Sequence, residues 1–151
     1  MIIRAYNNDT DLNEILFLLE ELRGSTDSNK FSFYLKDSGT YKDSYLKSKN
    51  YFVLIAKTED KIAGYIIAEH YTNFTVNLVM LYVGQFFRRK GVAQRLKDEM
   101  VKLCRLRGYR TIVSQVRTNN YESISLNQKA GWKQSLDKIY PDYYYWFTKE
   151  L

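Results

Sequence analysis

Residues 81–93 read LYVGQFFRRKGVA and mark the point where a strand passes through a basic turn into a helix. The strand expected over residues 74–83 ends in three apolar residues. The helix expected over residues 91–107 begins at Gly91, and Gly108 follows its last residue, where a helix commonly stops. A helix that starts just behind a strand end presents its first backbone amides at the edge of a sheet.

This turn has the chemistry of an anion site. The first amides of a helix have no partner within the helix, and the helix dipole adds to their attraction for a negative group. Gly91 and Ala93 let an anion approach the backbone closely, and Arg88, Arg89 and Lys90 add three positive charges. The spacing alone leaves a second interpretation open, which is an ordinary helix start with basic residues on its surface.

Three familiar motifs for phosphate binding or hydrolysis are absent from the sequence. No Gly-Lys-Ser/Thr follows the turn, so the turn is not a P-loop, and no Gly-x-Gly-x-x-Gly dinucleotide fingerprint occurs. A Gly-x-Ser-x-Gly elbow is also missing, so nothing in the sequence supports a serine hydrolase.

Composition predicts one domain over residues 1–151, with 45% hydrophobic residues to build its core. The formal net charge is +6, and nine of the 23 Lys and Arg residues lie between Arg88 and Arg110. Such a region attracts phosphates, nucleic acid or an acidic surface, or forms a solvated helix face. One cysteine, Cys104, and one histidine, His70, predict no internal disulfide and no metal site. The sequence shows no signal-peptide core and no apolar run of membrane length, which predicts a cytoplasmic protein without a membrane partner.

Apolar periodicity predicts further elements on both sides of the turn. We expect strands over residues 2–6, 51–57, 61–69, 110–116, from 132 onward and over 143–148. We expect helices over residues 9–22, within 25–49, and from a capping box of Asn119 and Glu122 to Gly131. Hairpins come first and a β-α-β unit lies in the middle. The fold expected is α/β (α+β), with a central, mixed, mostly antiparallel twisted sheet of about six or seven strands and about four flanking helices.

Two blocks of the sequence resemble the GNAT superfamily of N-acetyltransferases. The first, Arg88-x-x-Gly91-x-Ala93 behind a strand end, is similar to the acetyl-CoA signature Gln/Arg-x-x-Gly-x-Gly/Ala of that family. The second, residues 120–132 (NYESISLNQKAGW), is similar to the family's Asn-x-x-Ala/Ser-Ile-x-Leu-Tyr-x-Lys-x-Gly-Phe. The order and separation of the two blocks extend the resemblance over residues 51–132. The order of elements and the closing aromatic strand also look like the protein or polyamine acetyltransferases of the superfamily.

The resemblance implies that acetyl-CoA is the cosubstrate and that no metal is needed. Backbone amides of the basic turn would hold its diphosphate. The edge of the strand over residues 81–83 would bind the pantetheine arm, because this strand splays away from the strand over residues 110–116. The residues that the resemblance assigns to acetyl-CoA are Leu81, Tyr82, Val83, Arg88, Arg89, Lys90, Gly91, Val92, Ala93, Gln94, Asn120 and Ser123.

The resemblance also implies a catalytic acid and a catalytic base, and this sequence differs from the family at both positions. The usual tyrosine acid is replaced by Asn127, whose amide donates a hydrogen bond but supplies no proton at neutral pH. Residues 75–83 contain no carboxylate, so Glu69 on the neighbouring strand, acting through water, is the expected base, with an exposed hairpin end as its alternative role. The expected substitute for the phenol is Tyr143, from a cluster that also holds Tyr140, Tyr144 and Tyr145.

The function predicted from these features is transfer of an acetyl group from acetyl-CoA to a primary amine of a small molecule, polyamine or protein, by direct attack in a ternary complex. Two alternatives stay open. One is a catalytically weak acyl-CoA sensor on the same fold, and the other, with less support, is a basic nucleic-acid-binding module without a recognised motif. Residues 25–49 are expected to cover the acceptor end. Residues 143–147 are expected to offer an apolar edge strand for a homodimer.

Overall fold

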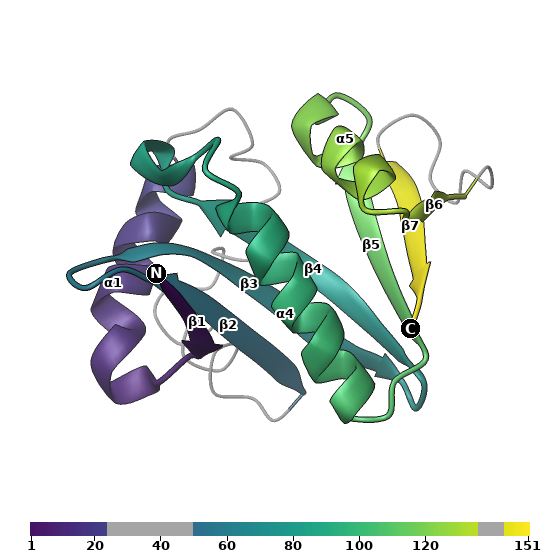
Figure 1. Ribbon diagram of the computed structural model, residues 1–151, viewed down its shortest axis with the longest axis horizontal. Helices are drawn as coiled ribbons and strands as arrows, with labels where there is room; N and C mark the ends of the chain where they lie inside the picture. Colours follow the sequence, from purple (N-terminus) through teal and green to yellow (C-terminus); the bar gives the residue numbers. More distant parts are fainter. Residues whose placement is uncertain (24–49, 136–143) are drawn as a thin grey trace.

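The computed structural model describes residues 1–23, 50–135 and 144–151, which build one sheet with helices on both of its faces (Figure 1). The strands are β1 (Ile2–Ala5), β2 (Tyr51–Lys57), β3 (Ile62–Thr72), β4 (Thr75–Val83), β5 (Thr111–Arg117), β6 (Lys133–Gln134) and β7 (Tyr144–Glu150). The helices are α1 (Asn8–Arg23), α4 (Val92–Leu106) and α5 (Tyr121–Lys129), with a short 3-10 turn η1 (Gln85–Phe87).

The seven strands lie in the order β1-β2-β3-β4-β5-β7-β6. Every paired neighbour in the described sheet is antiparallel except β4 and β5, which run parallel because α4 carries the chain back between them. The prediction of a mixed, mostly antiparallel sheet is therefore confirmed. A parallel pair in the middle of such a sheet brings the end of β4 and the start of α4 beside β5.

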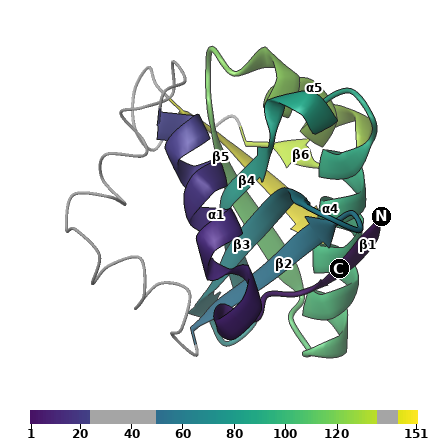
Figure 2. The same cartoon turned by 90° about the vertical axis from the view of Figure 1, so that its left-hand side faces the viewer.

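The helices α1 and α4 lie on opposite faces of the sheet (Figure 2). An apolar core fills each side. On one side α1 packs through Ile15 and Leu18 against alternate residues of the central strands, including Tyr65 and Ile67. On the other side α4 buries its apolar stripe against the opposite set of side chains, as the period of two along a strand requires. The two faces of the sheet are thus distinct environments, one beneath α1 and one beneath α4 and α5.

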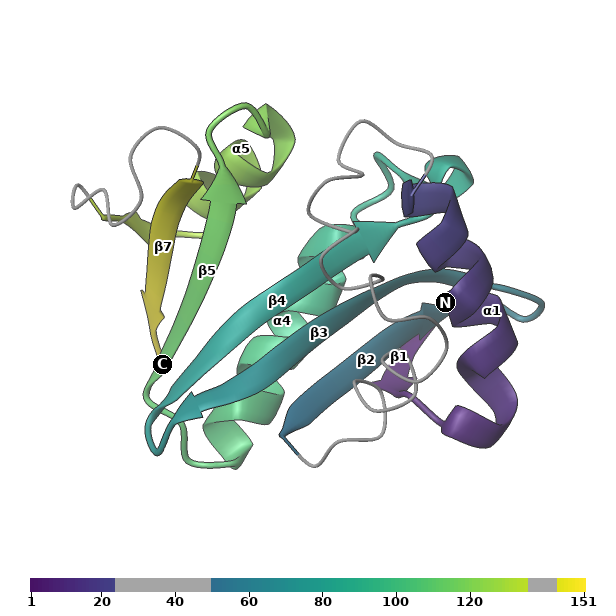
Figure 3. The ribbon, with the colours of Figure 1, turned by 180° about the vertical axis from the view of Figure 1, so that it is seen from behind.

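The parallel strands β4 and β5 are paired over only part of their length (Figure 3). Residues Thr75 to Leu78 pair with Thr111 to Ser114, and beyond this point no pairing joins the two strands. A register shift on the other side of β4 places Ile67 opposite Met80 and Ala68 opposite Leu78, which leaves Val79 as an extra residue. The splay that the sequence predicted is confirmed, and it starts beside this bulge.

The structure corrects two details, and a third falls outside the described residues. Asn120, not Asn119, caps α5, because its Oδ1 accepts the amide of Ser123; two adjacent asparagines are equally good caps by type. The strand β7 is not a free edge, since it pairs with β5 along its length and with β6 at Phe147 and Thr148. Three α-helices are described where about four were predicted, and the remaining one was assigned to residues 25–49, outside the described residues.

Candidate active site

The basic turn between β4 and α4 has an unusual backbone. Arg89 has a φ of 61° and Gly91 a φ of 76°, so two left-handed residues lie within three positions. The left-handed region costs a residue with a side chain about 1–2 kcal/mol, whereas glycine adopts it freely. Left-handed residues of this kind turn successive amides toward a common point, which is how anion-binding concavities are formed.

The first turn of α4 has amides without acceptors. The carbonyl of Gly91 accepts the amide of Arg95 at 3.1 Å, which fixes Gly91 as the residue that caps the helix. The next three amides, those of Val92, Ala93 and Gln94, precede the helical ladder and receive no acceptor from the described residues. A Cβ atom built on Gly91 would meet nothing within 4 Å, so the space beside this residue is open.

The side chain of Arg88 is engaged within the protein. Its Nε donates to the carbonyl of Val83 at 3.0 Å, and its Nη2 donates to the Tyr82 hydroxyl at 3.2 Å. That hydroxyl donates in turn to a carboxylate oxygen of Glu21 in α1 at 2.8 Å. Burial, followed by the Glu21 contact, raises the pKa of Tyr82 to about 12, so this phenol stays protonated. The side chain of Arg88 therefore links the turn to the end of β4. The side chains of Arg89 and Lys90 are exposed cations.

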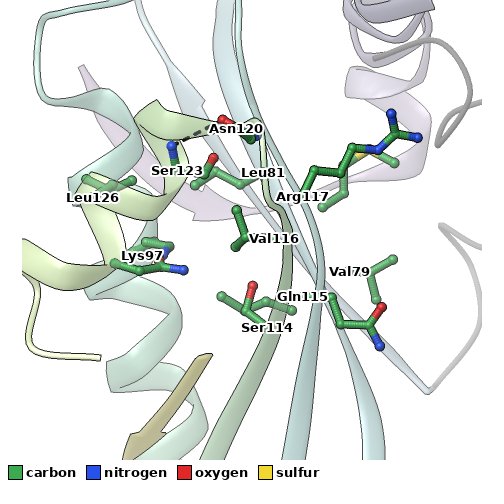
Figure 4. A pocket seen from close by; sticks show the side chains of 13 residues that line it. Val79, Leu81, Lys97, Ser114, Gln115, Val116, Arg117, Asn120, Ser123 and Leu126 are labelled. Atoms are coloured by element: carbon green, nitrogen blue, oxygen red, sulfur yellow. Dashed lines mark hydrogen bonds between the residues drawn. The ribbon is translucent and has the colours of Figure 1, made fainter. Parts of the chain in front are cut away.

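A pocket of about 100 Å³ lies where β4 and β5 separate, beside α4 and α5 (Figure 4). Side chains from both sides of the sheet surround it: Lys97 and Leu126 lie on the helix side, while Val79 and Arg117 lie on the opposite side. The pocket therefore extends through the split in the sheet. Its other lining residues are Leu78, Met80, Leu81, Ser114, Gln115, Val116, Asn120, Ser123 and Asn127.

Three of the residues that the resemblance assigned to acetyl-CoA lie together at the split of the sheet. Leu81, Asn120 and Ser123 line the pocket, and Figure 4 shows them at the same end of it. The side chain of Asn120 is occupied by its cap on Ser123, at 3.2 Å. Tyr82 and Val83 continue the open edge of β4 beyond the pocket, toward the amides of the first turn of α4. The part of β4 that is unpaired with β5 therefore lies between the split and the basic turn in the chain.

The predicted catalytic residues do not share one place. Asn127 lines the pocket, is 1% exposed and lies on α5. Glu69 does not line it: in the alternation of β3 it falls on the α1 face with Tyr65 and Ile67, and it accepts a hydrogen bond from Asn77 at 3.0 Å. Tyr143, with Tyr140, lies outside the described residues. The acid position and the base position are therefore on opposite faces of the sheet.

Lys97 is a buried, charged pocket residue that the sequence analysis missed. It is 5% exposed, and its Nζ contacts Oδ1 of Asn127 and lies 4.4 Å from the centre of the Trp132 ring. Burial, followed by repulsion from Lys149, lowers the pKa of Lys97 to about 7, against a smaller opposing effect of Asp98. A signal was present in the sequence, because Lys97 falls at helical spacing on the stripe that includes Met100, Val101 and Cys104.

Two further observations concern the described residues alone. Within residues 1–23, 50–135 and 144–151, no three His, Cys, Asp or Glu side chains are grouped so as to hold a metal ion. In the same ranges, every helix is too short or too polar to cross a lipid bilayer.

Helix amides without acceptors, beside a split in a mostly antiparallel sheet, suit a phosphate-bearing carrier. Comparison with protein families identifies the class of protein: a model of the acetyltransferase (GNAT) family matches residues 16–132. The chain therefore belongs to the GNAT acetyltransferase family, and it is an acyltransferase. Enzymes of this family use acetyl-CoA. A comparison with curated protein sequences finds no match.

Solved structures share the fold over the whole chain. A ribosomal-protein-alanine N-acetyltransferase from Brucella melitensis is 18% identical, with a TM-score of 0.79 over 100% of both chains. An N-acetyltransferase from Staphylococcus aureus Mu50 is 20% identical, with a TM-score of 0.78 over 99% of this chain and 97% of that one. An aminoglycoside 6'-N-acetyltransferase complexed with coenzyme A is 16% identical, with a TM-score of 0.74 over the same shares. At these identities the likeness establishes the fold alone.

Proposed function

We propose that this protein is an N-acetyltransferase that moves the acetyl group of acetyl-CoA to a primary amine by direct attack in a ternary complex. The observation that carries the proposal is the pocket in the β4–β5 split, lined from both faces of the sheet. A slot of this shape admits a thioester from the helix side and an amine from the α1 side. Both substrates then meet without a covalent intermediate on the protein.

The first turn of α4 supports the cofactor half of this proposal. Three amides without acceptors and a helix dipole suit a diphosphate, and the open position at Gly91 leaves room for it. Arg89 and Lys90 add screened, long-range attraction. The unpaired edge of β4 after Leu78 suits the amide groups of pantetheine, as an added strand would. The same edge offers a backbone amide near Leu81 to the oxyanion formed by attack.

The amine half of the proposal rests on Glu69. An alkyl ammonium with a pKa near 10.4 is neutral in only about one part per thousand near pH 7, a deficit of roughly 4 kcal/mol. Glu69 lies on the α1 face beside Asn77, two residues before the bulge at Val79 where the split begins. A water held between the carboxylate and the incoming amine would carry the proton away.

Release of coenzyme A in the presence of candidate amines tests the proposal. The panel includes a polyamine, a peptide with an N-terminal alanine and an aminoglycoside, since structural neighbours are named for the last two classes. We expect one class to give stoichiometric acetylated amine and free thiol, followed by mass spectrometry. If calorimetry detects no binding of coenzyme A, the proposed function is wrong.

A second candidate function is a catalytically weak acyl-CoA sensor on the same fold. It is favoured by Asn127 at the position of the expected tyrosine and by the absence of any carboxylate in β4. A sensor binds acetyl-CoA as tightly as the enzyme does but gives no acetylated product with any amine. The two functions are therefore separated by turnover, not by affinity.

The setting of the reaction also belongs to this proposal. We place the protein in the cytoplasm, on the sequence features given above. A homodimer is also part of this proposal, although β6 pairs with β7 at Phe147 and Thr148 and so covers part of the edge from which the dimer was predicted. Sedimentation at enzyme concentrations used for turnover measures this state.

A further inference from the structure

Lys97 is a lysine on the buried stripe of α4, where the other residues are apolar. It occupies the second turn of α4, between the buried Leu96 and Met100, and only 5% of it is exposed. A lysine usually keeps its ammonium group in water even when its carbon chain is buried. Burying an unpaired charge costs several kcal/mol of folding free energy. Buried groups with shifted pKa values therefore occur most often at functional sites.

No carboxylate pairs with Lys97 in the described part of the chain. On α4 itself the nearest acid, Asp98, is exposed and accepts a hydrogen bond from Gln94 at 2.8 Å. On β7, Lys149 repels the ammonium, while Arg117 is the charged residue that β5 contributes to the pocket. The residues that β4 and α5 contribute to the pocket carry no charge. The positive charge therefore has no carboxylate partner among the described residues, and its contacts are the Asn127 oxygen and the face of the Trp132 ring.

The same corner has more hydrogen-bond donors than acceptors. A lysine ammonium has three N–H groups, of which Oδ1 of Asn127 accepts one. The Nδ2 of Asn127 is buried and has no acceptor among the described residues. Buried donors without partners are uncommon in folded proteins. A surplus of donors and one net positive charge, both facing the pocket, fit a ligand atom that is an acceptor and becomes negative.

The place of Lys97 and Asn127 in the pocket indicates which ligand atom they would contact. The amides for the diphosphate lie at Val92 to Gln94, and Lys97 lies about one helical turn further along α4. Figure 4 shows its amino group directed toward the middle of the pocket, between Leu126 and Ser114. The long side chain of Lys97 extends from α4 into the pocket at the split, and a pantetheine arm laid along the open edge of β4 would bring its sulfur into this same pocket.

We propose that Lys97 is the proton donor to the departing thiolate of coenzyme A, and that Asn127 positions its side chain. This inference rests on the proposed function and completes it, since the expected tyrosine acid is absent. A pKa of about 7 suits the role, because it lies close to the operating pH of a general acid.

In the proposed transfer, sulfur gains one proton and the acceptor nitrogen loses one. The neutral amine forms a C–N bond to the thioester carbon, and the carbonyl electrons move to oxygen. When they return, the C–S bond breaks and its electron pair leaves on sulfur. Lys97 gives that sulfur one proton and becomes a neutral amine, while the new amide nitrogen loses one proton through the water beside Glu69. Lys97 then regains its proton from solvent, so that no net charge is created.

Titration of the thiol of bound coenzyme A tests the proposal without turnover. The thiolate absorbs in the ultraviolet, and the complex with dethio-coenzyme A, which lacks the sulfur, gives the baseline at every pH. We expect Lys97 to lower the apparent pKa of the bound thiol by at least about one unit relative to Lys97→Met. The control is Lys102→Met, because Lys102 lies on the same helix with 62% of its side chain exposed. An equal thiol pKa in wild type and Lys97→Met would overturn the proposal.

Steady-state kinetics provide a second test of the role of Lys97. We expect Lys97→Met to lower kcat by about 10-fold to 100-fold with little change in KM for acetyl-CoA, and to remove the fall of kcat at alkaline pH. Asn127→Asp, which sets a carboxylate against the ammonium, should move that alkaline fall to higher pH. A purely structural lysine would leave the pH profile in place. If Lys97→Met binds coenzyme A and transfers acetyl groups with the wild-type pH profile, the role of Lys97 is wrong and the proposed function stands. If neither the wild type nor any variant binds coenzyme A, the proposed function itself is wrong.

Discussion

In the proposed function, the first and second turns of α4 bind the same ligand in different ways. In the first turn the backbone is the functional group: three amides without acceptors follow Gly91, and the cations beside them are exposed. In the second turn a side chain is the functional group, because Lys97 is buried, unpaired by any described carboxylate and aimed into the pocket. The first turn should therefore tolerate changes of side chain, and the second should not.

The largest effect is expected at Lys97, in the stability of the free protein. Burial lowers its pKa from 10.5 to about 7. Between these values the unfolded chain binds a proton that the folded chain does not, so stability rises with pH through this window and the penalty is fully present below pH 7. Relative to Lys97→Met, wild type should gain roughly 4 kcal/mol from pH 7 to pH 10.5.

Denaturant unfolding of the two proteins at a series of pH values measures this gain. Lys97→Met should be the more stable protein at pH 6, because it removes a buried charge. A stability difference that does not change with pH would show that Lys97 keeps its proton in the folded state.

The next effect is expected at Gly91, where a side chain would enter the diphosphate space. Gly91→Val should lower affinity for acetyl-CoA by at least about 100-fold and stability by about 1–2 kcal/mol, since a branched residue is strained at a φ of 76°. Gly108→Val is the matched control: Gly108 has a φ of 84°, equally open space at its Cβ, and lies at the other end of the helix. Calorimetry with acetyl-CoA and thermal unfolding compare them. Equal affinities for the two variants would remove Gly91 from the site.

A smaller effect is expected at Glu69. Glu69→Gln should lower kcat by about 10-fold, and most strongly at low pH, where the amine is most fully protonated. Glu59→Gln, in the exposed turn between β2 and β3, changes the same charge away from the split and should leave the pH–rate profile unaltered. A profile that Glu69→Gln does not change would exclude this carboxylate from the mechanism.

The smallest effects are expected at the exposed cations of the first turn. Arg89→Ala and Lys90→Ala should each weaken acetyl-CoA binding only a few-fold, and less in high salt, because exposed charges are screened. Affinities measured at low and high ionic strength check this. A loss of 100-fold in either variant would mean that side chains, and not amides, hold the diphosphate.

The same two turns show how much the sequence could predict. Periodicity and glycine positions gave the strands around the site and the start of α4 almost to the residue, because an amphipathic pattern and a helix cap are local properties. The splay of β4 from β5 followed from the family resemblance, and pairing confirms it. The choice between Asn119 and Asn120 as cap was wrong, since the two residues are equivalent by type.

The chemistry of the second turn could not be predicted in this way. Lys97 and Asn127 are 30 residues apart, and only the tertiary fold brings their polar atoms together. One lysine on an apolar stripe is visible in the sequence, but its burial and its lack of a carboxylate partner depend on tertiary contacts. Glu69 shows the same limit, because the face of the sheet on which it lies decides which substrate it can reach.

The central claim is that the first amides of α4 hold the diphosphate of coenzyme A. Amide proton and nitrogen shifts of Val92, Ala93 and Gln94, followed during titration with coenzyme A and separately with pantetheine, test it most directly. We predict large shifts of all three amides with coenzyme A and none with pantetheine, which lacks the diphosphate. Binding of coenzyme A that moves other residues and leaves these three amides unchanged would contradict the claim.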